Sequence, residues 1–495
     1  RGSRNFTGKK TWLHEPPLHA RLLVCLPAWY ARLFTRLVRT NVCLFLGFDY
    51  LEFFHVCFIH WSPAFVSHPS PMRPTCFLPL LAVCLVVVSA RPVPGPVYSV
   101  PLHKAHAAHP IRPLAGVDKD PRVFGDVFPV AIFWVYLDVG TPPVSFPVAI
   151  DSGSYTLDIP SANCDGCVTK SPNAMYDKSK SSTSTSISCD EGSCDKCHDG
   201  QCGFSNTYET CDLNDPTAPC TISGSYYTDA VSFAGLGPVN ITFGAIEYQT
   251  KNFDQFKNID GVMGMGGPSG STNVFQTLVD HGFVQHAIWS LCLHQGSTSN
   301  GTFSIGGADP RLYTGDIQWS RNTRDGDMYS MRLQSIAFVD GSDKHVVSGA
   351  GDDAILDSGT NVLLLPTEAF DSVHAIFKSM CNDKALHGVC DVDQGTSLFD
   401  GKCLPFTDAQ LSQFPPLRIE VEGAESGTVT LEMSPSDYLI VEAEGTNLCL
   451  GIRPTGQGGI FIIGDTTMQN YLTVFDNDSH RIGWAAVNTD NCGSL

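Results

Sequence analysis

Basic residues are scarce in most of this 495-residue chain. Only 16% of its residues are charged, and from Gly125 onward 17 lysines and arginines stand against 45 aspartates and glutamates, a formal charge of −28. An acidic surface of this kind repels phosphate groups, which argues against nucleic acids and anionic membranes as partners. It suits a protein that works where its carboxylates are partly neutralised.

Two common hydrolase signatures are absent from the sequence. It contains neither the Gly-x-Ser-x-Gly elbow of many serine hydrolases nor the His-Glu-x-x-His motif of zinc proteases. No motif therefore supports either class of hydrolase. Cysteine, by contrast, is plentiful. Five of the 19 cysteines precede residue 91, and the remaining 14 are an even number that we expect to pair in an oxidising compartment.

The first methionine, Met72, opens a segment with the three parts of a secretory signal peptide. A short basic start is followed by an apolar stretch over residues 76–88 and by small residues that end at Ala90. The apolar stretch is too short to span a bilayer, so residues 72–90 are expected to be a cleaved signal peptide. Residues 1–71 are then expected to be an upstream or non-native extension.

A membrane anchor within residues 1–71 is the competing interpretation, but Asp49 and Glu52 interrupt its apolar run. No apolar tail follows Trp484. We therefore expect a mature chain without a stable membrane span, delivered through the secretory pathway to the extracellular space or to an acidic compartment such as a lysosome or vacuole. Three glycosylation sequons fit this route: Asn240, Asn300 and Asn477.

One short pattern occurs twice. Residues 149–160 read AIDSGSYTLDIP and residues 354–366 read AILDSGTNVLLLP, so Asp151 and Asp357 each follow an apolar run and precede Ser-Gly and a hydroxyl residue. A single Asp-Ser-Gly would be ordinary turn chemistry. Each copy also has a sequel, IDGVMGMGG or IFIIGD, whose apolar pair and glycine end 113 and 107 residues after the aspartate. This repetition predicts two similar lobes.

Short alternating or apolar segments bounded by Gly, Pro, Asp and Asn fill the rest of the chain, among them VYLDVG, VNITFG, MRLQSIAFVD and LTVFD. Such segments are typical of β-strands. Helical periodicity is limited to a few stretches, chiefly residues 272–282 and 366–381. The sequence therefore predicts a mainly β architecture.

A pseudo-twofold between the two loops would bring the carboxyl groups of Asp151 and Asp357 together. Two carboxylates about 3 Å apart would repel by roughly 5 kcal/mol at an effective dielectric near 20, so the pair must share a proton. One carboxyl then serves as acid and the other as base on a water held between them, with no metal or other cofactor. The residues suited to support the pair occupy the same positions after each aspartate: Gly153 and Ser154, and Gly359 and Thr360.

Together these motifs resemble those of the pepsin-like aspartic peptidases. The resemblance runs from about Val127 to Cys492 and includes VYLDVGTPPVSFPVAIDSGS, FSIGGADPRLYTGDIQW and FIIGDTTMQNYLTVFDNDSHRIGWAAV. It implies a bilobal acid-protease fold with an active-site cleft between the lobes. It also implies an endopeptidase that cleaves extended polypeptides in acid, with Asp151 and Asp357 at the catalytic positions; we expect a monomer.

The resemblance also divides the chain. It implies an inhibitory prosegment over residues 91–124, in which Lys104 and Lys119 are candidates to mask the aspartates, so the protein would be made as a zymogen. An N-terminal lobe over residues 125–312 and a C-terminal lobe over residues 313–495 would follow.

The sequence departs from the family near the expected flap, a mobile hairpin over the cleft. In the family, the first aspartate loop runs on to a tryptophan that supports a tyrosine of the flap, whereas Asp158 stands in the tryptophan's place here. Tyr208 matches the flap tyrosine, with Tyr226 and Tyr227 as rivals and a packing or surface role as the alternative. Glu209 stands where the family often has glycine. These departures leave subsite preference and pH optimum open.

A cysteine-rich stretch, CDEGSCDKCHDGQC, permits two further interpretations. Its Cys-x-x-Cys-His motif fits c-type haem attachment, and His198 with its neighbouring cysteines could be drawn as a zinc site. We expect plain disulfides instead and no metal, because eight cysteines lie between residues 164 and 220 of a secretory chain. The stretch resembles the insert of nepenthesin-like and plasmepsin-five-like members of the family.

The six cysteines from Cys292 onward permit 15 pairings by sequence alone. The resemblance favours Cys403 with Cys449 and, as in memapsin-type enzymes, Cys292 with Cys492, which leaves Cys381 with Cys390. In the first lobe, the segment after Tyr208 is bracketed by two further candidates, Cys211 and Cys220.

The function expected from these features is that of a secreted aspartic endopeptidase. The alternative is a catalytically silent protein of the same fold that binds partner proteins in its cleft. Retention of both aspartates, with Ser154 and Thr360, favours activity. Asp158 and the altered flap keep the alternative open.

Overall fold

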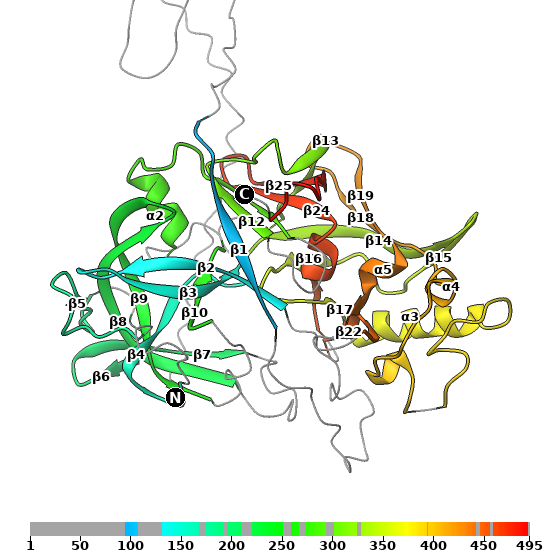
Figure 1. Ribbon diagram of the computed structural model, residues 1–495, viewed down its shortest axis with the longest axis horizontal. Coiled ribbons are helices and arrows are strands. Elements are labelled where there is room, and N and C mark those ends of the chain that lie inside the picture. The colour runs from blue at the N-terminus through cyan, green and yellow to red at the C-terminus, as the bar shows by residue number, and fades with distance from the viewer. Residues whose placement is uncertain are drawn as a thin grey trace, which may run out of the picture. The chain divides into compact units, whose positions relative to one another are not determined.

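The computed structural model describes residues 95–106, 131–167, 175–191, 194, 196–208, 220–250, 259–266, 273–293, 301–323, 328–393, 395–441, 446–455 and 459–493. The expected upstream extension and signal peptide lie outside these residues, as do Lys119, Glu209, Cys211 and Asn300. Strands dominate the described part of the chain (Figure 1).

The larger sheet has 15 strands in the order β13-β25-β24-β11-β12-β1-β2-β3-β10-β4-β9-β8-β7-β6, with β5 paired to β8. Its strands are β1 (Tyr98–His106), β2 (Ala131–Val139), β3 (Val144–Asp151), β4 (Leu157–Asp165), β5 (Thr185–Ser186), β6 (Lys196–His198), β7 (Gln201–Tyr208), β8 (Cys220–Phe233), β9 (Leu236–Gln249), β10 (Gly261–Gly264), β11 (Ile288–Cys292), β12 (Gly301–Ile305), β13 (Tyr313–Arg321), β24 (Tyr471–Asp476) and β25 (Arg481–Val487).

The second sheet has eight strands and belongs to the C-terminal half. Its order is β19-β18-β14-β16-β23-β17-β22, with β15 paired to β14, and a separate two-stranded sheet joins β20 to β21. The strands are β14 (Ser330–Asp340), β15 (Asp343–Val346), β16 (Asp353–Leu356), β17 (Leu363–Leu365), β18 (Leu417–Glu422), β19 (Thr428–Met433), β20 (Leu439–Val441), β21 (Leu448–Leu450), β22 (Ile452–Pro454) and β23 (Phe461–Ile463).

Helices are short and few among the described residues. They are α2 (Val274–Asp280), α3 (Thr367–Met380), α4 (Asp408–Leu411), α5 (Pro435–Tyr438), α6 (Asp465–Met468) and the 3₁₀-helix η2 (Leu398–Asp400). The two helices expected from periodicity are confirmed as α2 and α3. Asn273 caps α2 by accepting a hydrogen bond from Gln276 N, and α3 buries one apolar face that includes Phe370, Val373 and Phe377. None of the described helices is long and apolar enough to cross a membrane.

Each lobe repeats one arrangement of three strands around its aspartate. β3 pairs in parallel with β10, and β10 pairs antiparallel with β4. In the same way, β16 pairs in parallel with β23, and β23 pairs antiparallel with β17. The apolar-apolar-glycine segments seen in the sequence thus correspond to β10, which pairs with β3, and to β23, which pairs with β16. The expected mainly β, bilobal fold with a pseudo-twofold is confirmed.

Strand β3 shows why the site has a rigid base. Five consecutive residues of the strand, 146–150, are buried, as expected for a strand covered on both faces. Burying each large apolar side chain contributes about 1.5–3 kcal/mol. The chain therefore reaches Asp151 from an element that cannot shift without exposing Phe146, Val148 and Ile150.

Strand β1 lies within the range expected to be a prosegment, and it is built into the middle of the larger sheet (Figure 1). It pairs antiparallel with β12 through Tyr98 to Leu102 and with β2 through His103 to His106. Leu102 is completely buried. His103 stacks on Trp134 of β2 with ring centroids 4.4 Å apart.

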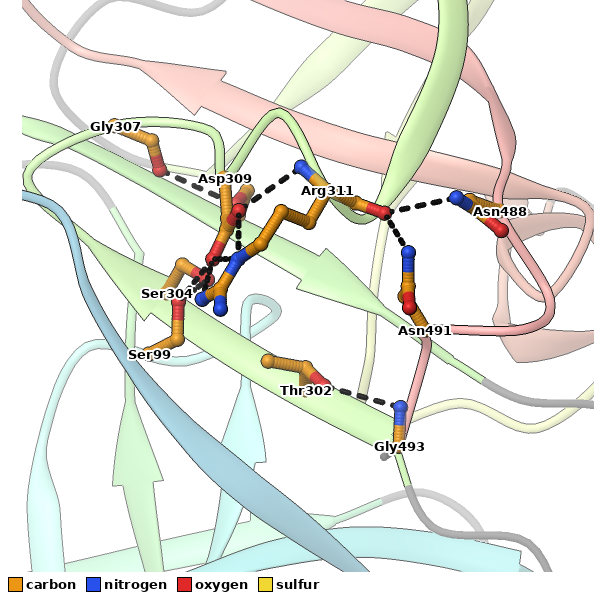
Figure 2. A network of polar contacts seen from close by, with 10 residues as sticks. Ser99, Thr302, Ser304, Gly307, Asp309, Arg311, Asn488, Asn491 and Gly493 are labelled. Atoms are coloured by element: carbon orange, nitrogen blue, oxygen red, sulfur yellow. Dashed lines mark hydrogen bonds and ion pairs between the residues drawn. The ribbon is translucent and has the colours of Figure 1, made fainter. Parts of the chain in front are cut away.

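Polar contacts tie β1 and the C-terminal segment to the same part of the sheet (Figure 2). Ser99 shares a hydrogen bond with Ser304 of β12 and donates another to Asp309 Oδ2. The guanidinium of Arg311 donates to both carboxylate oxygens of Asp309, and these hydrogen bonds lower the pKa of Asp309. The Arg311 carbonyl accepts hydrogen bonds from two C-terminal side chains, Asn488 and Asn491.

Six disulfides lie within the described residues. The three pairs implied by the resemblance are all present: Cys292–Cys492, Cys381–Cys390 and Cys403–Cys449. The cysteine-rich first lobe contains Cys164–Cys167, Cys189–Cys197 and Cys194–Cys202.

Candidate active site

The two aspartates stand at equivalent ends of the repeated strands. Asp151 is the last residue of β3 and lies in register with Gly264 of β10, and its carbonyl accepts a hydrogen bond from Met265 N at 2.7 Å. Asp357 directly follows β16, and its amide donates to Ile463 O at 3.0 Å. Each backbone is therefore held by the strand that carries the apolar-apolar-glycine sequel.

Reciprocal hydrogen bonds between two buried serines join the loops. Ser152 Oγ donates to Leu356 O at 2.9 Å and accepts from Ser358 N at 2.8 Å. Ser358 Oγ donates to Ile150 O at 2.9 Å and accepts from Ser152 N at 3.1 Å. These serines were not among the site residues expected from the sequence. The available signal was that both repeats place serine directly after the aspartate, and buried hydroxyls need hydrogen-bond partners.

The glycines of the loops allow the two carboxyl groups to approach. A Cβ at Gly153 would lie 2.6 Å from Asp357 Cγ, and a Cβ at Gly359 would lie 2.7 Å from Asp151 Oδ1. Both distances are shorter than van der Waals contact, so any side chain would push the loops apart. Each glycine thus makes room for the aspartate of the opposite lobe.

The carboxyl groups receive matching hydrogen bonds. Gly153 N donates to Asp151 Oδ1 at 2.8 Å, and Ser154 Oγ donates to Asp151 Oδ2. In the second loop, Gly359 N donates to Asp357 Oδ1 at 2.8 Å and Thr360 Oγ1 donates to Asp357 Oδ2 at 2.6 Å. The four donors fix the orientation of both carboxyl planes.

Burial raises the pKa of Asp151 well above its ordinary value, and the charge of Asp357 raises it further. A hydrogen bond between the two carboxyl groups acts in the same direction, whereas the donors Ser154 and Gly153 oppose it. Two negative charges on carboxyl groups close enough to share a hydrogen bond would repel strongly. The arrangement therefore favours a pair that holds one proton. Such a pair can supply an acid and a base at once.

The hairpin of β7 and β8 extends from the first lobe, and we refer to it as the β7–β8 hairpin. Tyr208 ends β7 in register with Cys220; its side chain lies outside the described residues. The two other candidate flap tyrosines contact neighbouring side chains. The ring of Tyr226 lies 5.2 Å from the ring of Phe204, and the Tyr227 hydroxyl accepts a hydrogen bond from Lys178.

Asp158 lies on β4 and is 1% exposed. Burial raises its pKa to about 7, although hydrogen bonds from Thr156 and Asn206 partly oppose this shift. The sequence marks the residue as unusual for its position. Its contact with Asn206 of β7 could not be found without the fold.

The cysteine-rich stretch is organised by disulfides rather than by a metal or haem. Cys197, the residue before His198, is bonded to Cys189, and Cys194 is bonded to Cys202. Sulfurs in disulfides are not the thiolates that zinc binds. His198 is exposed, and its Nδ1 lies 3.3 Å from a carboxylate oxygen of Asp199.

Comparisons with known proteins agree with this geometry. The family model described as eukaryotic aspartyl protease matches residues 133–192 and 203–487. Pepsin A of Sus scrofa is 27% identical over 357 residues, covering 71% of this chain and 80% of the relative. Gastricsin of Cavia porcellus is 25% identical over 368 residues, covering 72% and 80%. The chain belongs to the eukaryotic aspartyl protease family.

Proposed function

We propose that this protein is an aspartic endopeptidase in which Asp151 and Asp357 activate a water molecule against a peptide bond. The observation that supports this most directly is the interlocked pair of loops, which places two carboxyl groups in hydrogen-bonding reach with the same donors on each. Four residues support the pair. Ser154 and Thr360 orient the carboxyl groups by donating hydrogen bonds, and Gly153 and Gly359 leave room for them.

The chemistry follows from one proton shared by two carboxyl groups. The ionised carboxyl removes a proton from water as its oxygen bonds to the peptide carbonyl carbon, while the protonated carboxyl gives its proton to the carbonyl oxygen. The resulting tetrahedral diol collapses when the C–N bond breaks: the nitrogen gains a proton from one carboxyl, while a hydroxyl of the diol gives its proton to the other carboxyl. The products are a carboxylic acid and an amine, and the pair ends with the single proton that it began with.

Extended polypeptides are the proposed substrates and acidic pH is the proposed working condition, both as the family resemblance implies. Six disulfides among the described residues support passage through an oxidising compartment. We propose that the protein acts as a monomer without cofactor, outside the cell or in an acidic compartment.

The test is cleavage of an unfolded protein from pH 3 to 7 by residues 72–495 expressed through a secretory pathway. We expect activity that peaks in acid and that Asp357→Asn lowers by about 10² to 10⁴-fold, the usual contribution of acid–base catalysis. Asp343→Asn, the same change at an exposed site on β15, should leave activity unchanged. If the folded, acid-treated protein cleaves nothing at any pH, the catalytic proposal fails and the cleft should be studied as a protein-binding site.

A further inference from the structure

A carboxyl group is buried between β4 and the β7–β8 hairpin. Asp158 lies seven residues after Asp151, with 1% of its surface exposed. Its Oδ2 accepts hydrogen bonds from Thr156 Oγ1 at 2.9 Å and from Asn206 Nδ2 at 3.4 Å. Its Oδ1 is buried without a hydrogen-bond partner among the residues that the structure describes. An ionised carboxylate here would lack most of the donors that a buried charge requires.

The fold leaves just enough room for this side chain. Gly244 of β9 lies in register with Asp158, and a Cβ at Gly244 would lie 2.2 Å from Asp158 Oδ1. The same Cβ would lie 2.6 Å from the ring of Phe204, a β7 residue that is 1% exposed. Strands β4, β9 and β7 thus approach one another closely at Asp158, Gly244 and Phe204.

The groups that face Asp158 from the neighbouring strands are uncharged. Within the described part of the chain, its contacts and pairing partners on β7, β9 and β10 are Asn206, Phe204, Gly244 and Val262, and Thr156 precedes it in the loop. None of these side chains titrates. Burial alone raises the pKa of Asp158 to about 7, and no ion pair contributes to the shift.

We propose that Asp158 is a positioning residue that holds β7 against β4 while its carboxyl is neutral and releases β7 when the carboxyl ionises. A neutral carboxyl can remain buried with two donors. An ionised one gains stability only if water reaches Oδ1, and that oxygen is covered by β7 and β9. Strand β7 is the first strand of the β7–β8 hairpin and ends at Tyr208, two residues after Asn206. Its release from Asp158 would therefore displace this hairpin. The inference rests on the proposed function only in taking this hairpin to cover the substrate.

The first test measures the docking of β7 without relying on activity. Residues 72–495 with Asp357→Asn would be compared with the double variant Asp357→Asn, Asp158→Asn by amide hydrogen exchange at pH 5, 6, 7 and 8. After correction for intrinsic rates, we expect the protection of amides 201–208 to fall about tenfold from pH 5 to pH 6 and to level off above pH 7 when Asp158 is present, because the released carboxyl ionises at its ordinary pKa whereas the docked carboxyl ionises near pH 7. In the double variant, whose amide at this position does not titrate, protection should stay level. An equal pH dependence in both proteins would overturn the proposal.

A second variant covers the case in which Asp158→Asn does not fold. Asn206→Ala removes the hydrogen bond from β7 to Asp158, so protection of amides 201–208 should already be lower at pH 5. Unchanged protection in this variant would also overturn the proposal. Asp343→Asn on β15 is the matched control for a carboxyl-to-amide change and should behave as its parent.

Kinetics on the active background separate this inference from the proposed function. We expect KM for a polypeptide substrate to rise severalfold between pH 5 and pH 7.5 in the wild type and to change less in Asp158→Asn. Absence of cleavage in every protein would reject the proposed function, while the exchange data would still decide the role of Asp158. Cleavage with an identical pH dependence of KM in both proteins would reject the role of Asp158 alone.

Discussion

Single side chains set the chemistry of the site in two ways. Ser154 and Thr360 act on the carboxyl groups directly, by donating hydrogen bonds to their Oδ2 atoms. Ser152 and Ser358 act on the backbone, by joining one aspartate loop to the other. The first pair should therefore influence the pH dependence of the reaction, and the second pair should influence the stability of the assembled lobes.

Ser154→Ala should move the alkaline limb of kcat/KM to higher pH. The hydrogen bond from Ser154 favours the ionised form of Asp151 and so lowers its pKa; without it, Asp151 keeps the shared proton to a higher pH. A bond of about 1 kcal/mol corresponds to a shift of about 0.7 pH unit. The measurement is kcat/KM from pH 2 to 9, and Ser154→Thr, which keeps the hydroxyl, serves as the control. A downward shift would contradict the prediction.

Ser152→Ala should destabilise the protein by about 1–3 kcal/mol, because it leaves the buried Ser358 amide and Leu356 carbonyl without this partner. Chemical denaturation with and without the change measures the difference. Ser426→Ala, at an exposed loop position, should change stability by less than about 0.5 kcal/mol. Equal effects of the two changes would show that the bond between the lobes is unimportant.

At the scale of elements, the strands follow from the apolar segments bounded by turn residues, and α2 and α3 follow from helical periodicity. The position of β1, by contrast, does not follow from a local sequence pattern. Its sequence resembles the start of a prosegment, yet hydrogen bonds to β12 and β2 place it inside the sheet. Local sequence could suggest a strand but could not name its neighbours, because β12 lies about 200 residues away in the chain.

Leu102→Ala should lower the free energy of unfolding by about 2–5 kcal/mol, the usual cost of a cavity at a fully buried leucine. Val346→Ala removes apolar atoms from a side chain that is 55% exposed and should have little effect. Thermal unfolding of both variants, monitored by circular dichroism, tests the prediction. A Leu102→Ala protein as stable as its parent would indicate that β1 does not contribute to the core in solution.

On the scale of the whole molecule, distant parts of the chain are joined by the shared sheet and by disulfides. Cys292–Cys492 closes a loop with a sequence separation of 200, whereas Cys381–Cys390 spans 9. If disulfides act by restricting the unfolded chain, the longer loop should contribute more. The long bridge is connected to the C-terminal contacts of Arg311: Cys492 N donates to Asn488 O at 3.0 Å, and the Asn488 side chain donates to the Arg311 carbonyl (Figure 2).

Replacing both cysteines of the long bridge with alanine should cost about 5 kcal/mol, against about 2.5 kcal/mol for the pair Cys381 and Cys390, by the loop-entropy relation. Denaturant titration of the two double variants measures the difference. The short bridge is the internal control, since both changes remove one disulfide. A greater loss from the short bridge would contradict the entropic explanation.

The mainly β fold, two helices and the paired aspartate loops could be predicted from the sequence, because they depend on local periodicity, turn chemistry and an internal repeat. Together with its family resemblance, it also pointed to three disulfides. The fold was needed to show which serines join the lobes, that β1 occupies the centre of the sheet, and that Asp158 is buried beneath β7. Hydrogen bonds such as that from Ser152 to Leu356 connect residues about 200 positions apart, and desolvation depends on the strands that cover a side chain. The repeat marks the two serines, but neither their hydrogen-bond partners nor the strands that cover Asp158 can be read from the local sequence.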